Sequence, residues 1–352
     1  MGQSIALRIK RVLKHPLSSF VILGIVLLLV NVFYRAGIIQ DIAFVRSVAR
    51  VIIYSIVAMG FSLLLGYAGL ASLGTSGLIG LGAFLIQLTY SQKGIPMVIS
   101  ILICLVIALV VGALIGFISL RIEGMYLAII TLCLSTILVE LFRIGWGTDT
   151  FNLPRFQTFF GKEFPGYSSD GGLLVRDVMY YILVPLFVIV AMLTSNLMRS
   201  PAGRAMLAMK DSDSAAKAMG ISVLKYRLIA FIIATVYAVF AGCLYMFYFR
   251  STTYTDWGLA LSLNILAAVI VGGSKSLLGC ILGCFIIFGI DGMFLQNIPF
   301  FQNNTNFIYI ISGALIIIVV MFYPGGLAHL WLDLKILIRK LKLKWRHYKY
   351  GD

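Results

Sequence analysis

The sequence has little charge and few of the residues with which soluble enzymes carry out chemistry. Only 12% of its 352 residues are charged, and it holds 13 acidic residues, three histidines and five cysteines. Soluble domains carry about a quarter charged residues and about half apolar residues, whereas 61% of this chain is hydrophobic. These shortages exclude a soluble globular protein and indicate a membrane protein.

The cysteines and histidines are not arranged as metal ligands or nucleophiles. Every cysteine falls inside an apolar run, and the histidines lie in basic flanking segments. Cys280 and Cys284 share a helix face, but no histidine accompanies them, so we favour packing as small apolar side chains. We therefore predict no catalytic residue, no metal site and no cofactor, and we expect that the chain is not an enzyme.

Apolar runs long enough to cross a bilayer are abundant, since about 20 residues in a helix span a hydrocarbon core of about 30 Å. They predict an all-α polytopic membrane protein with about ten transmembrane helices. The first run follows a basic segment, as in a secretory signal, but it is too long for one and no small-x-small cleavage site follows it. The predicted helices are Leu17–Tyr34, Val45–Leu65, Leu70–Tyr90, Ile95–Leu120, Met125–Phe142, Val178–Leu197, Leu228–Phe249, Leu259–Val271, Leu277–Leu295 and Phe307–Tyr323.

The basic residues are distributed unevenly between the two sides of this predicted topology. With the N-terminus inside, 19 of the 28 lysines and arginines fall in cytoplasmic segments. This bias predicts that both termini are cytoplasmic and that the number of helices is even. Topology therefore accounts for the net charge of +15, and we favour it over nucleic-acid binding because the sequence shows no basic soluble domain.

The predicted topology divides the chain into three parts: a basic cytoplasmic N-terminus (1–16), a transmembrane domain (17–326) and a basic tail (327–352). The transmembrane domain includes an extracytoplasmic loop at 144–177 and a cytoplasmic loop at 199–221. In the tail, apolar residues recur at a helical spacing, and basic residues form a separate stripe at three- and four-residue steps. This pattern is typical of an amphipathic helix in the membrane interface. A helix that binds a partner is the alternative for the tail.

Glycine is concentrated in one segment of the transmembrane domain, where six of the 17 residues from Gly66 to Gly82 are glycine. Each glycine lowers helix propensity by about 1 kcal/mol relative to alanine, so we expect this segment to be broken, partly re-entrant or closely packed. Irregular backbone at membrane depth is tolerated where it lines a cavity or is buried in protein. For Thr131 and Asn264, ordinary helix packing is an equal alternative to a lining role. The candidate residues lining a translocation pathway are Gly66, Gly69, Gly74, Thr75, Gly77, Thr131 and Asn264.

Two further features have an ordinary structural explanation. Glu140 lies in a predicted span, where an ionisable group is a functional hypothesis, but it stands three residues before Arg143, so an i,i+3 ion pair is equally expected. The segment Gly272–Ser276 resembles a phosphate-binding loop, but it lacks the first glycine, and its serine precedes the lysine. We predict a short cytoplasmic turn there, so another subunit must bind ATP if ATP powers the protein.

The cytoplasmic loop between the sixth and seventh predicted helices has helix signals of its own. Ser200 followed by Pro201 is typical of an N-cap with proline in the first turn. Asp211, Ser212 or Asp213 is placed to cap a second short helix, which Gly220 is placed to end. The pattern predicts two short helices that dock on a partner, and a solvated loop is the alternative. The candidate coupling residues are Pro201, Gly203, Arg204, Asp211, Ala215, Ala216 and Gly220.

Four segments occur in the order found in one protein family: Gly66–Gly74, Leu120–Leu132, the loop Ser200–Ile221 and Val271–Gly279. With them the chain resembles, from about residue 60 to 326, the permease subunits of ABC importers for branched-chain amino acids, specifically the longer of the two permeases. The resemblance implies a second permease, two cytoplasmic ATPases, an extracytoplasmic solute-binding protein and the plasma membrane of a prokaryote. It also implies that the cytoplasmic loop acts as a coupling helix in a groove of the ATPase.

The chain departs from the family pattern at two places. Thr75 follows Gly74 where members often carry histidine, and Gly147–Leu153 stands where members often carry Thr-Gly-Gly-x-Asn-Gly. The second position is near where substrate would be handed over, so urea, short amides or sugars are alternative substrates. A secondary carrier driven by an ion gradient is the alternative mechanism. The spans lack the deep carboxylates and histidines typical of proton-coupled carriers, which disfavours proton coupling and leaves sodium coupling open.

Overall fold

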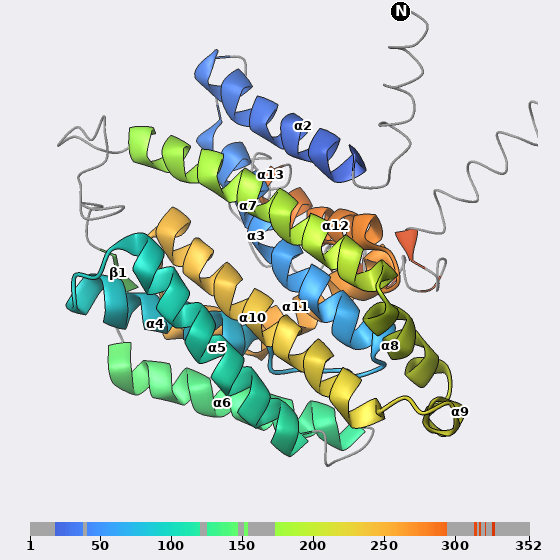
Figure 1. Cartoon of the computed structure of the whole chain (residues 1–352). Coiled ribbons are helices and arrows are strands. Elements are labelled where there is room, and N and C mark those ends of the chain that lie inside the picture. The colour runs from blue at the N-terminus through green and yellow to red at the C-terminus, as the bar shows by residue number, and fades with distance from the viewer. Residues whose placement is uncertain are drawn as a thin grey trace, which may run out of the picture.

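The structure is a computed structural model that describes residues 18–37, 41–119, 125–146, 151–153 and 173–293, with a few single positions between 313 and 327. The described part is almost entirely helical (Figure 1). Its α-helices are α2 (Ser18–Arg35), α3 (Ile42–Ser62), α4 (Thr75–Ile86), α5 (Met97–Ser119), α6 (Met125–Trp146), α7 (Leu173–Arg199), α8 (Pro201–Asp211), α9 (Asp213–Ala218), α10 (Val223–Phe249), α11 (Leu259–Gly272), α12 (Leu277–Cys284) and α13 (Ile290–Met293).

Three α-helices continue into a π-helical turn, and one is preceded by a 3-10 turn. The π-helical turns η1 (Leu63–Tyr67), η2 (Gln87–Gln92) and η4 (Phe285–Gly289) continue α3, α4 and α12, and the 3-10 turn η3 (Tyr254–Trp257) precedes α11. Two short strands, β1 (Phe151–Asn152) and β2 (Ser251–Thr252), pair antiparallel. Strand β1 lies at the opposite end of the bundle from α9 (Figure 1).

Six of the described helices are long and apolar enough to cross a membrane, which confirms the all-α membrane class. They are Ser18–Arg35, Ile42–Tyr67, Met97–Phe117, Tyr126–Gly145, Asp177–Arg199 and Val223–Phe249, and two shorter apolar helices are Leu259–Gly272 and Leu277–Gly289. The total of ten spans and the cytoplasmic termini stay predictions, because residues 1–17, most of the tenth predicted helix and nearly all of the tail lie outside the described residues.

The third predicted helix begins at Thr75 and not at Leu70. The backbone from Ala68 to Gly74 is not helical, and Gly69 has a φ of +71°, in the left-handed region that only glycine adopts readily. The glycine-rich segment is therefore broken, as the sequence predicts.

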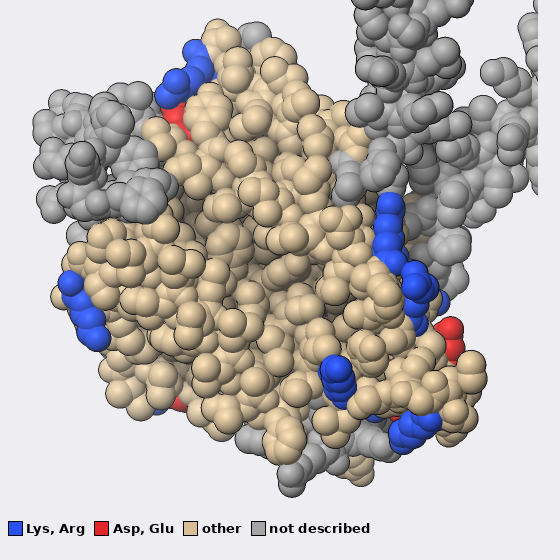
Figure 2. Space-filling view, in the orientation of Figure 1, with Lys and Arg blue, Asp and Glu red and all other residues tan. Residues whose placement is uncertain are grey.

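Helix α3 occupies the centre of the bundle. The apolar window of its span is 89% buried, against 17% for α2 and 22% for α5 and for α6. It packs against α7, α10, α11 and α12. The outer helices expose apolar side chains, for example Leu102, Val106 and Leu114 of α5, each more than half exposed. Lipid tails accept such a surface as readily as protein does. The face seen in Figure 2 is largely uncharged, with the lysine and arginine side chains toward its edges.

Glycines let neighbouring helices approach through their backbones. A Cβ on Gly283 of α12 would collide with the carbonyl oxygen of Ala268 on α11, and one on Gly116 of α5 would lie 2.8 Å from Leu228 Cδ1 of α10. Both glycines belong to small-xxx-small patterns, which favour close helix contacts in membranes. At these two positions the helices are therefore closely packed.

Candidate functional site

The two short helices predicted between the sixth and seventh spans are present as α8 and α9, which lie together at one end of the bundle after α7 (Figure 1). The hydroxyl of Ser200 accepts a hydrogen bond from the backbone N–H of Gly203 at 3.3 Å and caps α8. The hydroxyl of Ser212 accepts from the N–H of Ala215 at 3.3 Å and caps α9. Gly220, with a φ of +77°, follows the end of α9. Of the three candidate caps for the second helix, Ser212 is therefore the one used.

The inner face of the α8–α9 pair packs onto the bundle. Met206, Met209 and Ala216 are buried in an apolar cluster that also contains Leu64 of η1 and Phe231 of α10. Burial of large apolar side chains of this kind contributes about 1.5–3 kcal/mol each. The pair is thus packed against η1 and α10.

The outer face of the pair carries five of the seven candidate coupling residues: Pro201, Arg204, Asp211, Ala215 and Gly220 are exposed. Beside them, the side chain of Met219 is 82% exposed. Met219 therefore adds an apolar side chain to the outer surface of the pair. Figure 2 shows lysine and arginine side chains gathered at this end of the molecule.

The other two candidates, Gly203 and Ala216, face inward. Both are buried, and a Cβ on Gly203 would lie 2.6 Å from the carbonyl oxygen of Leu197 at the end of α7. A bulky residue at position 203 would therefore disturb the junction of α7 and α8. The structure assigns both residues to the packing of the pair on its own chain.

Two polar contacts tie the pair to neighbouring elements. The guanidinium of Arg227 on α10 donates to the carboxylate of Asp213 on α9 at 2.7 Å, and both side chains are partly exposed. The ammonium of Lys210 on α8 donates to the carbonyl oxygens of Leu65 at 3.1 Å and Gly66 at 2.9 Å. Lys210 is not among the sequence candidates, since nothing local in the sequence marks it.

The glycine-rich segment is packed against backbone on several sides. A Cβ on Gly66 would collide with the carbonyl oxygen of Ser274, one on Gly74 would lie 2.6 Å from the carbonyl oxygen of Thr131, and one on Gly77 would lie 2.8 Å from Ser135 Cα. Gly69 alone of the four candidate glycines is exposed. Gly66, Gly74 and Gly77 therefore serve close packing.

Hydroxyl groups from two other helices hold the start of α4. The Ser262 hydroxyl of α11 accepts from the N–H of Ser76 at 2.9 Å, and the Ser135 hydroxyl of α6 accepts from the N–H of Gly77 at 3.1 Å. The Thr131 hydroxyl accepts from Leu73 N–H and donates to the carbonyl of Ala128, both at 3.0 Å. The first N–H groups of a helix otherwise lack partners, so these hydroxyls replace the missing side-chain cap at Gly74.

For Thr131, these contacts favour the packing alternative, because the side chain is 1% exposed and its hydroxyl both donates and accepts. Ser135 and Ser262 are the residues that the sequence reasoning missed. The spacing of four between Thr131 and Ser135 places both hydroxyls on one face of α6, and that spacing is the signal that could have found Ser135. Asn264 lies elsewhere, exposed on α11 beside Leu263.

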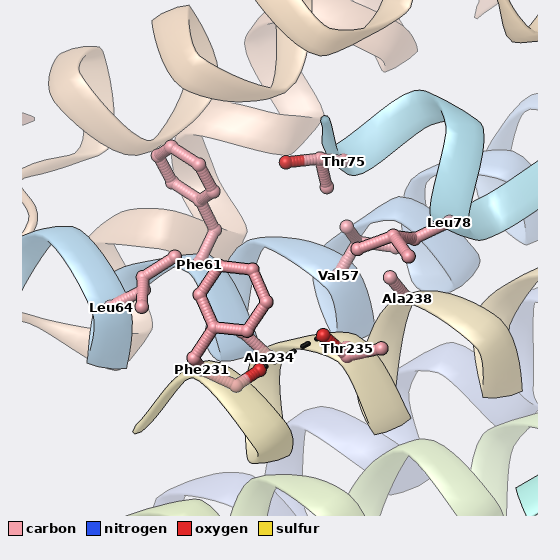
Figure 3. Close-up of a pocket in the computed structure, with 9 residues that line it drawn as sticks. All are labelled: Val57, Phe61, Leu64, Thr75, Leu78, Phe231, Ala234, Thr235 and Ala238. Carbon is pink, nitrogen blue, oxygen red and sulfur yellow. Dashed lines mark hydrogen bonds between the residues drawn. The ribbon is translucent and has the colours of Figure 1, made fainter. Parts of the chain in front are cut away.

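Thr75 lines a small open hollow between α3, η1, α4 and α10 (Figure 3). Most of the lining is apolar, and the second hydroxyl, that of Thr235, donates to the carbonyl of Phe231 at 3.0 Å. The residues that line the hollow are Val57, Phe61, Leu64, Thr75, Leu78, Phe231, Ala234, Thr235 and Ala238.

The remaining candidates have structural roles. Glu140 and Arg143 form the i,i+3 ion pair at 2.8 Å, with both side chains about half exposed. The turn after α11 ends in Ser276, whose hydroxyl accepts from the N–H of Gly279 at 3.2 Å and caps α12. Among the described residues, no group of three or more histidine, cysteine or acidic side chains is placed to hold a metal ion.

Comparison with known proteins gives a consistent result. Residues 43–320 match the family described as "Branched-chain amino acid transport system / permease component". The chain is 27% identical over 293 residues to the "High-affinity branched-chain amino acid transport system permease protein LivM" of Escherichia coli (strain K12), an alignment that covers 78% of this chain and 67% of that one.

A second relative comes from an archaeon. The "Probable branched-chain amino acid transport permease protein LivM" of Methanocaldococcus jannaschii is 23% identical over 326 residues, with 78% of this chain and 90% of that one covered. No solved structure matches the chain significantly.

Proposed function

Since the chain belongs to the family of permease components of branched-chain amino acid transport systems, we propose that it forms part of the membrane pathway of an ABC importer for branched-chain amino acids. It works beside a second permease, which is a different chain or another copy of this one. Two cytoplasmic ATPase subunits hydrolyse the ATP, and an extracytoplasmic solute-binding protein delivers the substrate. The membrane is the plasma membrane of a prokaryote.

The observation that carries this proposal is the ordered α8–α9 pair. Its two helices are each capped by a serine hydroxyl, its inner face is anchored by Met206 and Met209, and its outer face presents Ala215 and Met219 to solvent. A solvated loop needs neither the caps nor the buried anchors. An ordered helix pair with a partly apolar outer face can bind in a groove of another protein, in the way that amphipathic helices bind in grooves of their partners.

The proposed mechanism is alternating access between two conformations. ATP binding brings the two ATPase subunits together, and the outer face of the α8–α9 pair moves with them. The inner face transmits that movement to η1 and α10, because Leu64 and Phe231 belong to the same apolar cluster. The pathway between the two permeases then opens to the other side of the membrane.

The proposed orientation places the α8–α9 end in the cytoplasm and residues 144–177 outside. Arg199, Arg204, Lys217 and Lys225 are exposed at or beside the α8–α9 pair, in agreement with the excess of basic residues on cytoplasmic segments. Ten spans, a cytoplasmic N-terminal segment (1–16), a transmembrane domain (17–326) and an interfacial tail (327–352) complete the proposed topology.

Reconstitution tests the proposed function. Proteoliposomes containing this chain, its partner permease, the ATPase subunits and the binding protein are expected to take up labelled leucine when ATP is supplied to the ATPase side. Vesicles without the ATPase subunits, given a sodium or proton gradient, are expected to take up none. Uptake driven by the ion gradient alone would establish the secondary carrier, and ATP-driven uptake of urea, amides or sugars in place of leucine would change the substrate.

A further inference from the structure

The central helix ends in an unusual way. Helix α3 continues into η1, which stops at Tyr67, and the last carbonyl groups of a helix have no partner within it. The carbonyls of Leu63 and Leu64 accept from the N–H groups of Ala68 and Leu70, each at 3.0 Å. The next two carbonyls, those of Leu65 and Gly66, accept from the ammonium of Lys210. The helix is thus capped by a side chain that stands 144 positions or more further along the chain.

Lys210 differs from the other two cations of the α8–α9 pair. Arg204 and Lys217 are exposed, whereas Lys210 is partly buried. Its stem packs beside Gly69, where an added Cβ would lie 3.3 Å from the lysine Cγ. The absence of a side chain at Gly69 thus leaves room for the lysine stem, which places the ammonium at the helix end.

Electrostatics favour this contact and also limit its strength. The C-terminal end of a helix carries partial negative charge, which favours a cation there. Burial, and after it the nearby Lys275, lower the pKa of Lys210, because both disfavour the charged ammonium. If α8 moves away and water enters, the ammonium regains its hydration, which offsets part of the loss of the two hydrogen bonds. Such a contact can form and break during a transport cycle.

The capped end of η1 also contacts the α11–α12 turn and leads to the start of α4. Gly66 packs directly against the carbonyl of Ser274, in the turn between α11 and α12. The non-helical backbone 68–74 leads from the capped end to α4, whose start is fixed by Ser135 and Ser262. A displacement of the capped end therefore reaches α4 and the α11–α12 turn through backbone contacts.

We propose that Lys210 is a positioning residue for transport, whose contact with the Leu65 and Gly66 carbonyls transmits the displacement of α8 to the break between η1 and α4. This inference rests on the proposed function and adds the residue that joins the ATPase-docking pair to the membrane helices. The apolar cluster around Met206 holds α8 against the bundle. The hydrogen bonds of Lys210 fix the position of the end of η1 relative to α8.

The test uses the complete transporter in proteoliposomes. Lys210→Met keeps most of the apolar stem and removes the ammonium, and Lys210→Arg keeps a cation. Lys93→Met, at an exposed lysine that follows η2 and lies outside the α8–α9 pair, is the matched control. ATP hydrolysis and leucine uptake are measured on the same vesicles, and assembly is measured by copurification of the ATPase subunits. We expect Lys210→Met to assemble and hydrolyse ATP while the leucine transported per ATP falls by about tenfold, within the range of known coupling effects. Lys210→Arg is expected to restore most of the ratio, and Lys93→Met to leave it unchanged.

An unchanged ratio in Lys210→Met would overturn the inference, and so would a parallel loss of assembly, hydrolysis and uptake, which would show a purely structural role. If Lys210→Met does not fold, Lys210→Gln decides, since it keeps a neutral N–H donor of shorter reach: assembly with a lowered ratio supports the inference, and a normal ratio contradicts it. Absence of ATP-driven uptake in the unmodified transporter would instead overturn the proposed function, so the two failures are distinguishable.

Discussion

Helices α4 and α10 cross at two glycines, and the crossing allows a quantitative prediction. A Cβ on Gly82 would collide with the carbonyl oxygen of Val239, and a Cβ on Gly242 would collide with that of Ile79. On Gly242 the same Cβ would also lie 2.9 Å from the carbonyl carbon of Ile79 and 3.2 Å from the amide nitrogen of Ala83. All of these atoms belong to backbone, which cannot rotate away as a side chain can.

Gly242→Ala is therefore expected to push the two helices apart. A separation of about 0.5–1 Å forfeits a quarter to a half of the dispersion attraction of the contacts that it opens. Overpacking of this kind costs about 1–3 kcal/mol, occasionally more, while alanine regains about 1 kcal/mol of helix propensity. Because the atoms met are all backbone, the upper part of the overpacking range applies, about 2–3 kcal/mol. After the gain in helix propensity, we expect the free energy of unfolding to fall by about 1–2 kcal/mol.

Thermal denaturation in detergent, followed by size-exclusion chromatography of the surviving folded protein, measures this effect. Gly116→Ala is the matched control, because it also adds a methyl group facing α10 but meets the movable end of Leu228. The double variant Gly82→Ala with Gly242→Ala should lose less than the sum of the two single variants, since the first substitution already separates the helices. Equal melting temperatures for Gly242→Ala and Gly116→Ala would refute the backbone-contact argument.

Met206→Ala should lower the free energy of unfolding by about 2–5 kcal/mol through the cavity that it leaves and should speed tryptic cleavage after Arg204 and Lys210 of α8; an unchanged cleavage rate would contradict the packing of α8 on the bundle. Ser135→Ala should cost about 1–3 kcal/mol, because it removes an acceptor from the start of α4, while exposed Thr136→Ala should shift the melting temperature little. Asp213→Asn should cost at most about 1 kcal/mol by weakening the ion pair to Arg227, and high salt should narrow the difference in melting temperature from the unmodified protein.

Local signals in the sequence predicted the α8–α9 pair correctly. Capping depends on residues two or three positions apart, so Ser200, Pro201 and Gly220 mark helix ends without reference to the rest of the fold. The break in the glycine-rich segment was predictable for the same reason, since the propensity of glycine is a local property. The helix starts only at Thr75, where hydroxyls from α6 and α11 supply the cap.

Contacts between distant segments were not predictable from a single sequence. Lys210 reaches Gly66 across 144 positions, and Ser262 reaches Ser76 across 186. The sequence could not show that Gly203 faces the end of α7, because the packing of α8 on its own chain decides which side of the helix is buried. For Thr131, the structure favours packing over pathway lining through a hydrogen bond from Leu73 that spans 58 positions.

A site-specific photo-cross-linking experiment tests most directly the claim that the α8–α9 pair docks on the ATPase. A photoreactive residue replaces Met219, which is 82% exposed beside α9, and a control variant carries it at Ile144, which is 83% exposed at the far end of α6. In the assembled transporter, we predict a cross-link from position 219 to an ATPase subunit and none to it from position 144. A complex that hydrolyses ATP and transports leucine, yet gives no cross-link from position 219 to the ATPase, would contradict the account.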